Sequence, residues 1–507
     1  MILTLDFGTS VTKAGLWGPD GPVAIAGAPV ATSHPAPGRC EQLPSDWWAS
    51  LTEACAQLQE LAPSAMASVE VVGCTGARQS FALADAGGGP LGPAILWSDQ
   101  RAGAEAAALG RALGDADGAP ASGIVPDAGS VAAKIAWLAA HDRDRLEASA
   151  WVLAPRDLVA WWLTGAVATD ATMASRSGLY DGDDVVVEEL AGTAATKLAP
   201  VLASDRVTGR VSRRAAGALG LVGGTPLVIG AGDRAAEVLG SGAGADCPMA
   251  SWGTTANVSL PVAVVPDRLP GGLVVSRAAD GGWLLEGGLS AGGTLLAWLG
   301  GITGRPPEEL AELAAASPPG ARGVTATPWL DGARAPWWRP GARTALVGLS
   351  PANGVADLSR AMVEAVAWDL LRCLEAMAGR EPAGPEVSGL AAAGAGSSVA
   401  VWLDVLSGIT GLPVLCRRSG QAASAGAALL AARALGIPLE LDRIDPVERR
   451  LAPQSTSVAR YRSDRTWIDR VAASVVGLEP PPEAEPADPA APGEPRAPAP
   501  GGESPCD

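Results

Sequence analysis

The sequence predicts an α/β protein with two similar lobes around a central cleft, and three observations support this prediction. Short apolar runs typical of strands alternate with helical patterns along the 507 residues. A strand–turn–strand pattern occurs near the start, and a second one follows in the other half of the chain. The length corresponds to several domains of roughly 150 residues each. Two lobes imply a cleft, which is where proteins commonly hold ligands.

The bulk composition indicates a globular chain and argues against some classes of partner. Hydrophobic residues make up 48% of the sequence and charged residues 18%, which is sufficient for large cores. The formal net charge of −17 argues against a general nucleic-acid or membrane-surface role, because both need a basic face. We therefore expect a small-molecule partner, with no nucleic acid and no membrane.

The cysteine and histidine content narrows the chemistry further. The 7 cysteines are scattered without a C-x-x-C pair, which is typical of a reduced, cytoplasmic chain. No basic leader precedes the first apolar run, so we expect no signal peptide. The 2 histidines are far apart in sequence and exclude a His-rich metal site. If the protein is an enzyme that needs a base, a carboxylate is the expected group.

The first half of the chain contains a predicted hairpin and two further strands. Residues 2–6 and 14–17 are the strands of the hairpin, and DFGTS at residues 6–10 forms its turn. Apolar runs at residues 69–74 and 226–229 predict two more strands. The last of these runs leads into a Gly-Ala-Gly-Asp turn.

The second half repeats this theme. Residues 249–262 again follow the order strand, Gly-Thr-Thr turn, strand, and residues 387–398 form an apolar run that opens into a Gly-rich turn. Apolar residues four apart predict a helix over residues 357–377, which Gly379 can end. Further helical patterns cover residues 402–409 and 422–435.

The chain divides in two near residues 240–248. We assign residues 1–242 to an N-terminal lobe and residues 243–478 to a C-terminal lobe. Residues 479–507 are rich in Pro, Ala, Glu and Gly and cannot bury a core, so we predict a disordered tail.

The two Gly-Thr turns suit phosphate binding, because Gly lets the backbone N–H groups approach a phosphate and the hydroxyls add donors. A P-loop is excluded, since Lys13, Lys134 and Lys197 are the only lysines and none follows the Gly-Lys-Ser/Thr pattern. Facing each other across a cleft, the two turns could grip a polyphosphate. Asp6 would then need a cation, which implies Mg²⁺. Each turn by itself could equally be a simple tight hairpin.

Several segments in register resemble the FGGY family of carbohydrate kinases, within the actin/hexokinase/Hsp70 superfamily. The resemblance covers about residues 1–470 and rests on the order and spacing of its motifs. The matching segments are residues 5–17, 41–51, 90–102, 161–175, 228–242, 346–366 and 391–414. The resemblance implies two ribonuclease H-like lobes of the actin-like ATPase fold around a central cleft.

The resemblance also implies where ATP and Mg²⁺ bind. Phosphate contacts are expected from both lobes, and adenosine contacts from the C-terminal lobe. A metal site is expected at Asp6 and Asp233. The expected nucleotide-binding residues are Asp6, Gly8, Thr9, Ser10, Lys13, Gly253, Thr254, Thr255, Gly394, Ala395, Gly396 and Ser397.

Asp233 is the candidate catalytic base. Phosphoryl transfer to a hydroxyl is mostly positioning and charge neutralisation, but something must accept the hydroxyl proton. Asp233 follows an apolar strand through a Gly-rich turn, which suits a residue presented in a cleft, and the resemblance places the family's base at this position. The alternative for an isolated Gly-x-Gly-Asp is an Asp that caps a loop.

The expected substrate contacts are Arg78, Gln79, Asp99, Arg101, Asp233 and Arg234. Arg78 and Gln79 stand where xylulokinase-like members have Met-His, and this is closer to the glycerol kinase pattern. Arg78 could instead be a surface cation. Arg234 departs from the usual Asn or Gln of the family and favours the carboxylate form of Asp233. We hypothesise that Arg78 and Arg234 together favour a substrate with a carboxylate or a phosphate.

Two other segments have structural interpretations. Trp337 and Trp338 are expected to pack and not to stack on a sugar. The helix that contains Lys134 lies near a family signature and is also expected to be structural.

The sequence thus predicts an ATP-dependent kinase that phosphorylates a hydroxyl of a small sugar or polyol, such as a pentulose, glycerol or a sugar acid. Two alternatives share the phosphate turns: an actin-like ATPase module and a degenerate regulator that binds a sugar or nucleotide. Asp233 and the WSDQR segment at residues 97–101 favour the kinase. Because dimers are common in the family, a homodimer is compatible with the resemblance.

Overall fold

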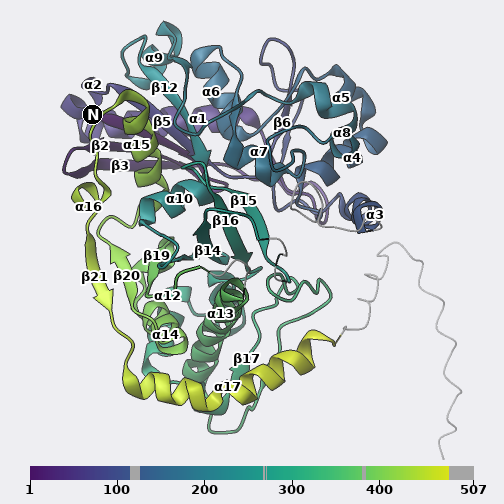
Figure 1. Cartoon of the computed structure of the whole chain (residues 1–507), viewed down its shortest axis with the longest axis vertical. Helices are drawn as coiled ribbons and strands as arrows, with labels where there is room; N and C mark the ends of the chain where they lie inside the picture. The colour runs from purple at the N-terminus through teal and green to yellow at the C-terminus, as the bar shows by residue number, and fades with distance from the viewer. Residues whose placement is uncertain (115–125, 267–268, 270, 380–383, 479–507) are drawn as a thin grey trace, which may run out of the picture.

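The computed structural model describes residues 1–114, 126–266, 269, 271–379 and 384–478. Within them the chain forms two lobes, each built on one large mixed sheet with helices against it (Figure 1). This arrangement confirms the predicted α/β class and the two lobes. The tail predicted over residues 479–507 lies outside the described residues.

The first sheet has the strand order β11-β12-β5-β1-β2-β3. Its first three strands in sequence form an antiparallel meander, and β5 pairs in parallel with both β1 and β12. Leu3 and Leu5 of β1 are completely buried, as expected of a central strand with helices on both faces. The strand bounds are β1 (Ile2–Phe7), β2 (Val11–Gly18), β3 (Gly21–Pro29), β5 (Val71–Gly76), β11 (Val207–Arg210) and β12 (Pro226–Gly232).

The second sheet repeats this topology. Its order is β15-β16-β14-β13-β19-β20-β21, in which β13, β14 and β16 form the antiparallel meander and β13, β19 and β20 run parallel. The bounds are β13 (Met249–Trp252), β14 (Ala256–Val262), β15 (Val274–Arg277), β16 (Trp283–Gly288), β19 (Leu390–Ala393), β20 (Val414–Arg417) and β21 (Val447–Leu451). The turn between β1 and β2 and the turn between β13 and β14 therefore occupy equivalent places in the two lobes.

The helices largely follow the predicted patterns. The predicted helix over residues 357–377 is α13 (Val355–Ala378), and the N–H of Gly379 closes it on the carbonyl of Glu375. The predicted helices over residues 402–409 and 422–435 are α14 (Ala400–Thr410) and α15 (Ala422–Leu435). The other helices are α1 (Pro44–Leu61), α2 (Pro63–Ala67), α3 (Gly103–Gly114), α4 (Val131–His141), α5 (Arg143–Ala148), α6 (Pro155–Thr164), α7 (Ala171–Ser177), α8 (Glu188–Ala191), α9 (Arg213–Leu219), α10 (Asp233–Ser241), α11 (Gly293–Thr303), α12 (Pro307–Ala316), α16 (Leu441–Ile444) and α17 (Ser455–Val476).

Short elements complete the lobes. Two-stranded ladders and 3-10 helices connect the larger elements around the cleft. They are β4 (Glu41–Gln42) with β7 (Ala94–Ile95), β6 (Ala82–Ala84) with β8 (Trp151–Leu153), β9 (Thr169–Asp170) with β10 (Val201–Leu202), β17 (Thr325–Ala326) with β18 (Leu346–Val347), and the 3-10 helices η1 (Gly192–Lys197), η2 (Ala321–Gly323) and η3 (Ala395–Ser398).

Helix α15 lies on the first sheet although it comes late in the chain (Figure 1). Its Ser424 hydroxyl lies 2.6 Å from the Thr4 hydroxyl of β1 and accepts a hydrogen bond of 2.8 Å from the Trp17 indole of β2. Most of α15 is Ala and Gly, which lets its backbone approach its neighbours closely. The helix therefore ties the C-terminal half of the chain to the N-terminal lobe.

Helices α10 and α15 cross at two glycines. A Cβ on Gly240 would lie 1.9 Å from the carbonyl oxygen of Ala422, and a Cβ on Gly426 would lie 2.0 Å from that of Ala236. Such distances are far below van der Waals contact, so only Gly fits at either position. Since α10 begins at Asp233, this crossing fixes the position of the predicted catalytic residue.

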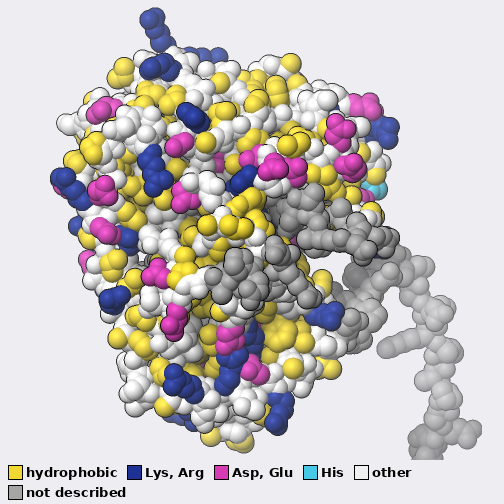
Figure 2. Space-filling model, viewed as in Figure 1, with side chains coloured by type: hydrophobic (Ala, Val, Ile, Leu, Met, Phe, Trp, Pro, Cys, Tyr) yellow, Lys and Arg dark blue, Asp and Glu magenta, His cyan; other side chains and the backbone are white. Residues whose placement is uncertain are grey.

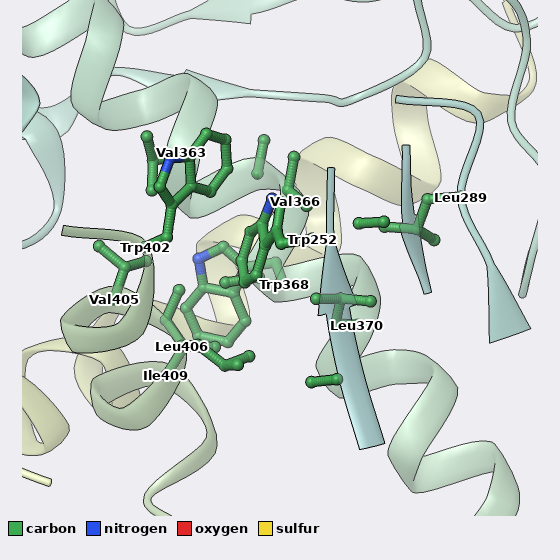
Figure 3. Close-up of a cluster of buried hydrophobic side chains, with 14 of the residues drawn as sticks. Trp252, Leu289, Val363, Val366, Trp368, Leu370, Trp402, Val405, Leu406 and Ile409 are labelled. Carbon is green, nitrogen blue, oxygen red and sulfur yellow. The ribbon is translucent and has the colours of Figure 1, made fainter. Parts of the chain in front are cut away.

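The core of the C-terminal lobe supports the second Gly-Thr turn. Trp252, the last residue of β13, is buried, and its ring centroid lies 4.7 Å from that of Trp402 on α14. Val366 and Trp368 of α13 belong to the same apolar cluster (Figure 3). The residue that precedes Gly253 is therefore held rigidly by packing.

Basic and acidic side chains are interspersed on the face shown in Figure 2. Among the described residues, no helix is both long enough and apolar enough to cross a membrane.

We expect Gly426→Ala to destabilise the protein, because the added methyl group would overlap the backbone of α10. Overpacking of this kind costs about 1–3 kcal/mol, and more where the obstacle is backbone. The melting temperature, followed by circular dichroism, should fall clearly. The matched control is Gly301→Ala on α11, where the new Cβ meets nothing within 4 Å. Equal melting temperatures of the two variants would contradict the close crossing.

Candidate active site

A cavity of about 230 Å³ lies between the two lobes, and it contains several of the predicted site residues. Both lobes contribute to its walls, and both Gly-Thr turns reach it, through Thr9 and Thr255. The described lining residues are Thr9, Ala77, Arg78, Gln79, Trp97, Arg176, Asp233, Arg234, Thr255, Ala256, Asn257, Gly272, Val274, Glu286, Gly288, Leu289, Arg334 and Trp338.

Asp233 lies where β12 ends and α10 begins. Its carboxylate accepts a hydrogen bond of 2.7 Å from the backbone N–H of Arg234, and 47% of the side chain is exposed to the cavity side of the molecule. The preceding strand bulges at Gly230, where φ is +70° and a Cβ would lie 1.6 Å from the carbonyl oxygen of Cys74. Gly230 is therefore required by the close approach of β12 to β5.

A buried polar chain holds the backbone just before Asp233. The N–H of Gly232 donates to the hydroxyl of Thr172 at 2.7 Å, and that hydroxyl donates to Asp170, also at 2.7 Å. Asp170 forms an ion pair of 2.9 Å with the fully buried Arg156. Because every member of this chain has a partner, it fixes the end of β12.

The first phosphate turn, Gly8-Thr9-Ser10, is fixed from behind by side chains of two other segments. The Gln42 amide donates to the carbonyl of Thr9 at 2.6 Å, and the Trp97 indole donates to the Thr9 hydroxyl at 3.0 Å. Trp47 in turn donates to Gln42 at 2.9 Å. The segments at residues 41–51 and 90–102 thus position this turn.

Asp6 lies on β1 opposite Lys13 of β2, beside this turn. Burial raises the pKa of Asp6 from 3.8 to about 6; Lys13 opposes this shift, and the nearby carboxylates of Asp233 and Glu237 add to it. A buried carboxylate near other carboxylates is a fitting ligand for a cation. In the described residues, no cluster of three or more potential ligand side chains is found. A site for Mg²⁺ does not need such a cluster, because this ion is usually bound by one or two carboxylates together with the phosphates of the nucleotide. Asp6 fits that role.

The second Gly-Thr turn, Gly253-Thr254-Thr255, connects β13 to β14. The loop predicted to contact adenosine lies directly beside it, since a Cβ on Gly394 or on Gly396 would come within 2.6 Å of Trp252. Ala395 and Ser397 lie in η3, and the Ser397 carbonyl accepts a hydrogen bond of 2.8 Å from Arg449. The residues expected to bind nucleotide in the C-terminal lobe are thus brought together by packing around Trp252.

Arg78 crosses the cleft to the other lobe. Its two terminal nitrogens bind both oxygens of Glu286 on β16, at 2.8 and 2.7 Å, and its Nε lies 3.5 Å from the Asp233 carboxylate. Burial by itself raises the pKa of Glu286, but the ion pair with Arg78 outweighs burial and holds the pKa well below its usual range. Only 11% of the Arg78 side chain is exposed, so the interpretation of Arg78 as a surface cation is wrong.

Arg234 does not pair with Asp233 through its side chain. Its Nη1 binds Glu237, one turn along α10, at 2.5 Å. Glu237 also accepts a hydrogen bond from Ser251 at 2.8 Å, which links α10 to the second sheet. The two arginines that suggested an anionic substrate therefore both have protein carboxylates as partners.

Asp99 and Arg101, which were expected to contact the substrate, lie outside the described lining of the cavity. They form an ion pair of 2.7 Å, Arg101 also binds Glu41 at 2.5 Å, and Asp99 is completely buried. Burial alone raises the pKa of Asp99, but hydrogen bonds from Arg101 and from the Cys40 N–H bring it below its usual value. The pair fixes the loop that carries Trp97. Because neither residue belongs to the described lining of the cavity, nothing in the geometry supports them as substrate contacts, and these two roles stay predictions.

Four charged or aromatic lining residues escaped the sequence analysis as site residues: Arg176, Glu286, Arg334 and Trp338. Arg176 directly follows the motif that ends at Ser175, and Glu286 is a single acid in a strand that is otherwise apolar. A charged residue in an apolar segment was the signal that could have found these two. Trp337 and Trp338 were both expected to pack; Trp337 does pack, against Trp329, but Trp338 lines the cavity.

The helix with Lys134 is structural, as expected, but it supports the site. The Lys134 ammonium donates to the backbone carbonyls of Leu96, Gly129 and Gln79 at 2.6, 2.7 and 3.2 Å. Burial lowers its pKa to about 7. Lys134 thereby fixes the backbone of Gln79, which has a φ of +63°.

The duplicated sheets, the central cleft and the two Gly-Thr turns define an actin-like phosphotransferase fold. The comparisons identify the family. Residues 1–240 match the N-terminal domain of the FGGY family of carbohydrate kinases, and residues 249–435 match its C-terminal domain. The chain belongs to this family. It is therefore a phosphotransferase with an alcohol group as acceptor, and kinases of this family use ATP.

Several named kinases are similar to this chain over most of its length. A glycerol kinase of Aromatoleum aromaticum is 30% identical and covers 92% of this chain and 99% of its own. A glycerol kinase of Gloeobacter violaceus is 34% identical over 74% of this chain and 77% of its own. The solved structure of a xylulose kinase from Rhodospirillum rubrum is 27% identical, with a TM-score of 0.81 over 93% of this chain and 98% of that one.

The raised pKa of Asp6 has a testable effect on stability. Because the pKa in the folded state lies above the ordinary 3.8, ionising Asp6 costs folding free energy; the penalty is absent below about pH 4 and complete above about pH 6. We therefore expect Asp6→Asn to raise the melting temperature of the ligand-free protein at pH 8 and to leave it unchanged near pH 4.

The same variant also tests the metal site. Mg-ADP should raise the melting temperature of the unmodified protein at pH 8 and have a much smaller effect on Asp6→Asn. Glu60→Gln, on the exposed face of α1, is the control and should behave like the unmodified protein at every pH. A variant at Asp6 that is less stable at pH 8 than the unmodified protein would contradict the raised pKa.

Proposed function

We propose that the protein transfers the γ-phosphate of Mg-ATP to a hydroxyl of a small sugar or polyol, with Asp233 as the general base. The observation that carries this proposal is the position of Asp233. It lines an interlobe cavity that is also bordered by Thr9 and Thr255, one residue from each phosphate turn. A hydroxyl beside Asp233 would thus lie next to the phosphates.

Each part of the site has a role in this reaction. Gly8, Thr9 and Ser10 bind phosphate oxygens from one lobe, and Gly253, Thr254 and Thr255 bind them from the other. Lys13 lies opposite Asp6 and adds positive charge near the phosphates. Asp6, with Asp233, would hold Mg²⁺, which neutralises charge on the phosphates when bound. Gly394, Ala395, Gly396 and Ser397 lie toward the adenosine.

Asp233 receives the proton of the acceptor hydroxyl. Its carboxylate is partly exposed and lies at the start of α10. The buried chain through Thr172, Asp170 and Arg156 keeps its backbone in place. Closure of the lobes would exclude water and protect ATP from hydrolysis.

Arg78 and Gln79 are the proposed acceptor contacts from the N-terminal lobe, because both line the cavity beside Asp233. The relatives named as glycerol kinases make glycerol a candidate acceptor, and a pentulose is another. The division at residues 242 and 243, the cytoplasmic location and the homodimer stay predictions.

We expect Asp233→Asn to lower the rate of acceptor-dependent ADP release by about 10²–10⁴-fold, since general base catalysis contributes a factor of this size. ADP release would be followed with Mg-ATP across a panel of polyols, ketoses and aldonic acids.

The control for this variant is Glu60→Gln, which should retain full activity. Binding of Mg-ATP should survive in Asp233→Asn, because the phosphate turns are unchanged. Full acceptor-dependent turnover by Asp233→Asn, or ADP release that does not depend on any acceptor, would contradict the proposed function.

A further inference from the structure

One arginine of the cavity lacks a partner for its charge. Arg176, on α7, lines the cavity and is only 8% exposed. Its Nη2 donates to the Gln79 side chain at 3.1 Å. Its Nε and Nη1 are buried and have no hydrogen-bond partner among the residues that the structure describes. Buried donors of a charged group are costly to leave unpaired, so they point to a missing ligand.

The other three arginines of the cavity are already paired. Arg78 binds Glu286, Arg234 binds Glu237, and Arg334 binds Asp127 at 3.0 Å. Within the described part of the chain, no carboxylate lies within ion-pair distance of Arg176. Arg176 is therefore the one arginine of the described cavity lining without an ion-pair partner.

The electrostatic surroundings of Arg176 support this. Burial lowers the pKa of Arg176 to about 10; Glu286 attracts the guanidinium, whereas Arg78 and Arg334 repel it. The side chain is still charged at neutral pH. A bound anion would relieve both the desolvation and the repulsion.

The cavity also contains a second unpaired donor and a strained backbone. The Nε of Arg234 is buried and has no partner among the described residues. Gln79, which positions Arg176, has a φ of +63°, and Trp338 on the opposite lobe has a φ of +48°. Strained non-glycine residues gather where a ligand is held.

We propose that the acceptor is a polyhydroxylated anion, whose carboxylate or phosphate group is bound by the free donors of Arg176, while one of its hydroxyls lies at Asp233. This inference rests on the proposed function, since it names the class of acceptor for the same site. It moves the anion contact from Arg78 and Arg234, where the sequence suggested it, mainly to Arg176. Hydrogen bonds between two charged groups are stronger than those to a neutral hydroxyl, so an acid should bind at least about tenfold tighter than its neutral counterpart.

The test is direct binding, measured by isothermal titration calorimetry on the full chain with Asp233→Asn, with and without Mg-ADP. This background prevents transfer and leaves Arg176 intact. The probes are matched pairs: glycerate and glycerol, xylonate and xylitol, gluconate and glucitol, with glycerol 3-phosphate as the phosphate arm. We expect at least one acid to bind tenfold or more tighter than its neutral partner. Tight binding of a sugar acid would indicate a site for a carboxylate, and tight binding of glycerol 3-phosphate alone would indicate a site for a phosphate.

Variants then assign the preference to Arg176. Arg176→Met should reduce the preference for the acid to about onefold, and Arg176→Lys, which keeps the charge, should retain part of it. Arg277→Met is the matched control. Arg277 is another arginine between the lobes, where it pairs with Asp184 at 3.3 Å, but it lies outside the described cavity lining. It should keep the full preference. Because it removes an unpaired buried charge, Arg176→Met should also melt no lower than the unmodified protein without ligand.

Three results would overturn the inference: no acid binds, neutral polyols bind as tightly as their acids, or Arg176→Met keeps the preference. Failure of the proposed function is distinguishable from these, because it would appear as an absence of phosphoryl transfer from ATP in the unmodified protein. If phosphoryl transfer were absent, acids could still bind to the protein. If the preference for acids were absent, transfer to a neutral polyol could still occur.

Discussion

The site depends on the contact between helices α10 and α15, which lie between the two sheets. The backbones touch at Gly240 and Gly426, and no side chain can be placed between them. Helix α15 is also bound to β1 and β2 through Ser424, and α10 is bound to the second sheet through Glu237 and Ser251. Because Asp233 is the first residue of α10 and Asp6 lies on β1, this contact sets the distance between the proposed base and the proposed metal ligand. The glycines of these helices thus hold both residues in position although they lie outside the described cavity lining.

Around this fixed contact, ion pairs join the two lobes. The arginine comes from the N-terminal lobe in one pair and from the C-terminal lobe in two others. Arg78 of the N-terminal lobe binds Glu286 of the C-terminal lobe, whereas Arg334 and Arg277 of the C-terminal lobe bind Asp127 and Asp184 of the N-terminal lobe. Three of these six residues line the cavity. The pairs neutralise Arg78, Glu286 and Arg334 in the cavity wall, whereas Arg176 has no ion-pair partner among the described residues. The chemistry of the site is therefore set as much by which charges are neutralised as by which are present.

The sequence was sufficient to predict the lobes, the hairpins and the phosphate turns, because these depend on local patterns. Strand–Gly-Thr–strand is visible in a single segment, and the apolar period of α13 is visible in its own residues. The family resemblance, which rests on the same local motifs, is confirmed. What the sequence did not show is pairing across the fold. Nothing in the local sequence shows that Arg101 binds Glu41, that Glu286 neutralises Arg78, or that Trp338 turns toward the cavity while Trp337 packs. These contacts join segments up to about two hundred residues apart, for example 78 with 286, and only the folded chain reveals them.

The interlobe ion pairs also bear on how a ligand enters. Opening the cleft would separate Arg78 from Glu286 and Arg334 from Asp127, and would expose these groups to solvent. Separating opposite charges requires work, and dissolved salt reduces this work by screening the separated charges. The equilibrium between open and closed forms is thus coupled to ionic strength, even for a ligand that carries no charge. A cleft closed by charge pairs of this kind opens more readily in concentrated salt than in dilute buffer, so the ionic composition of the medium becomes part of the gating of the site.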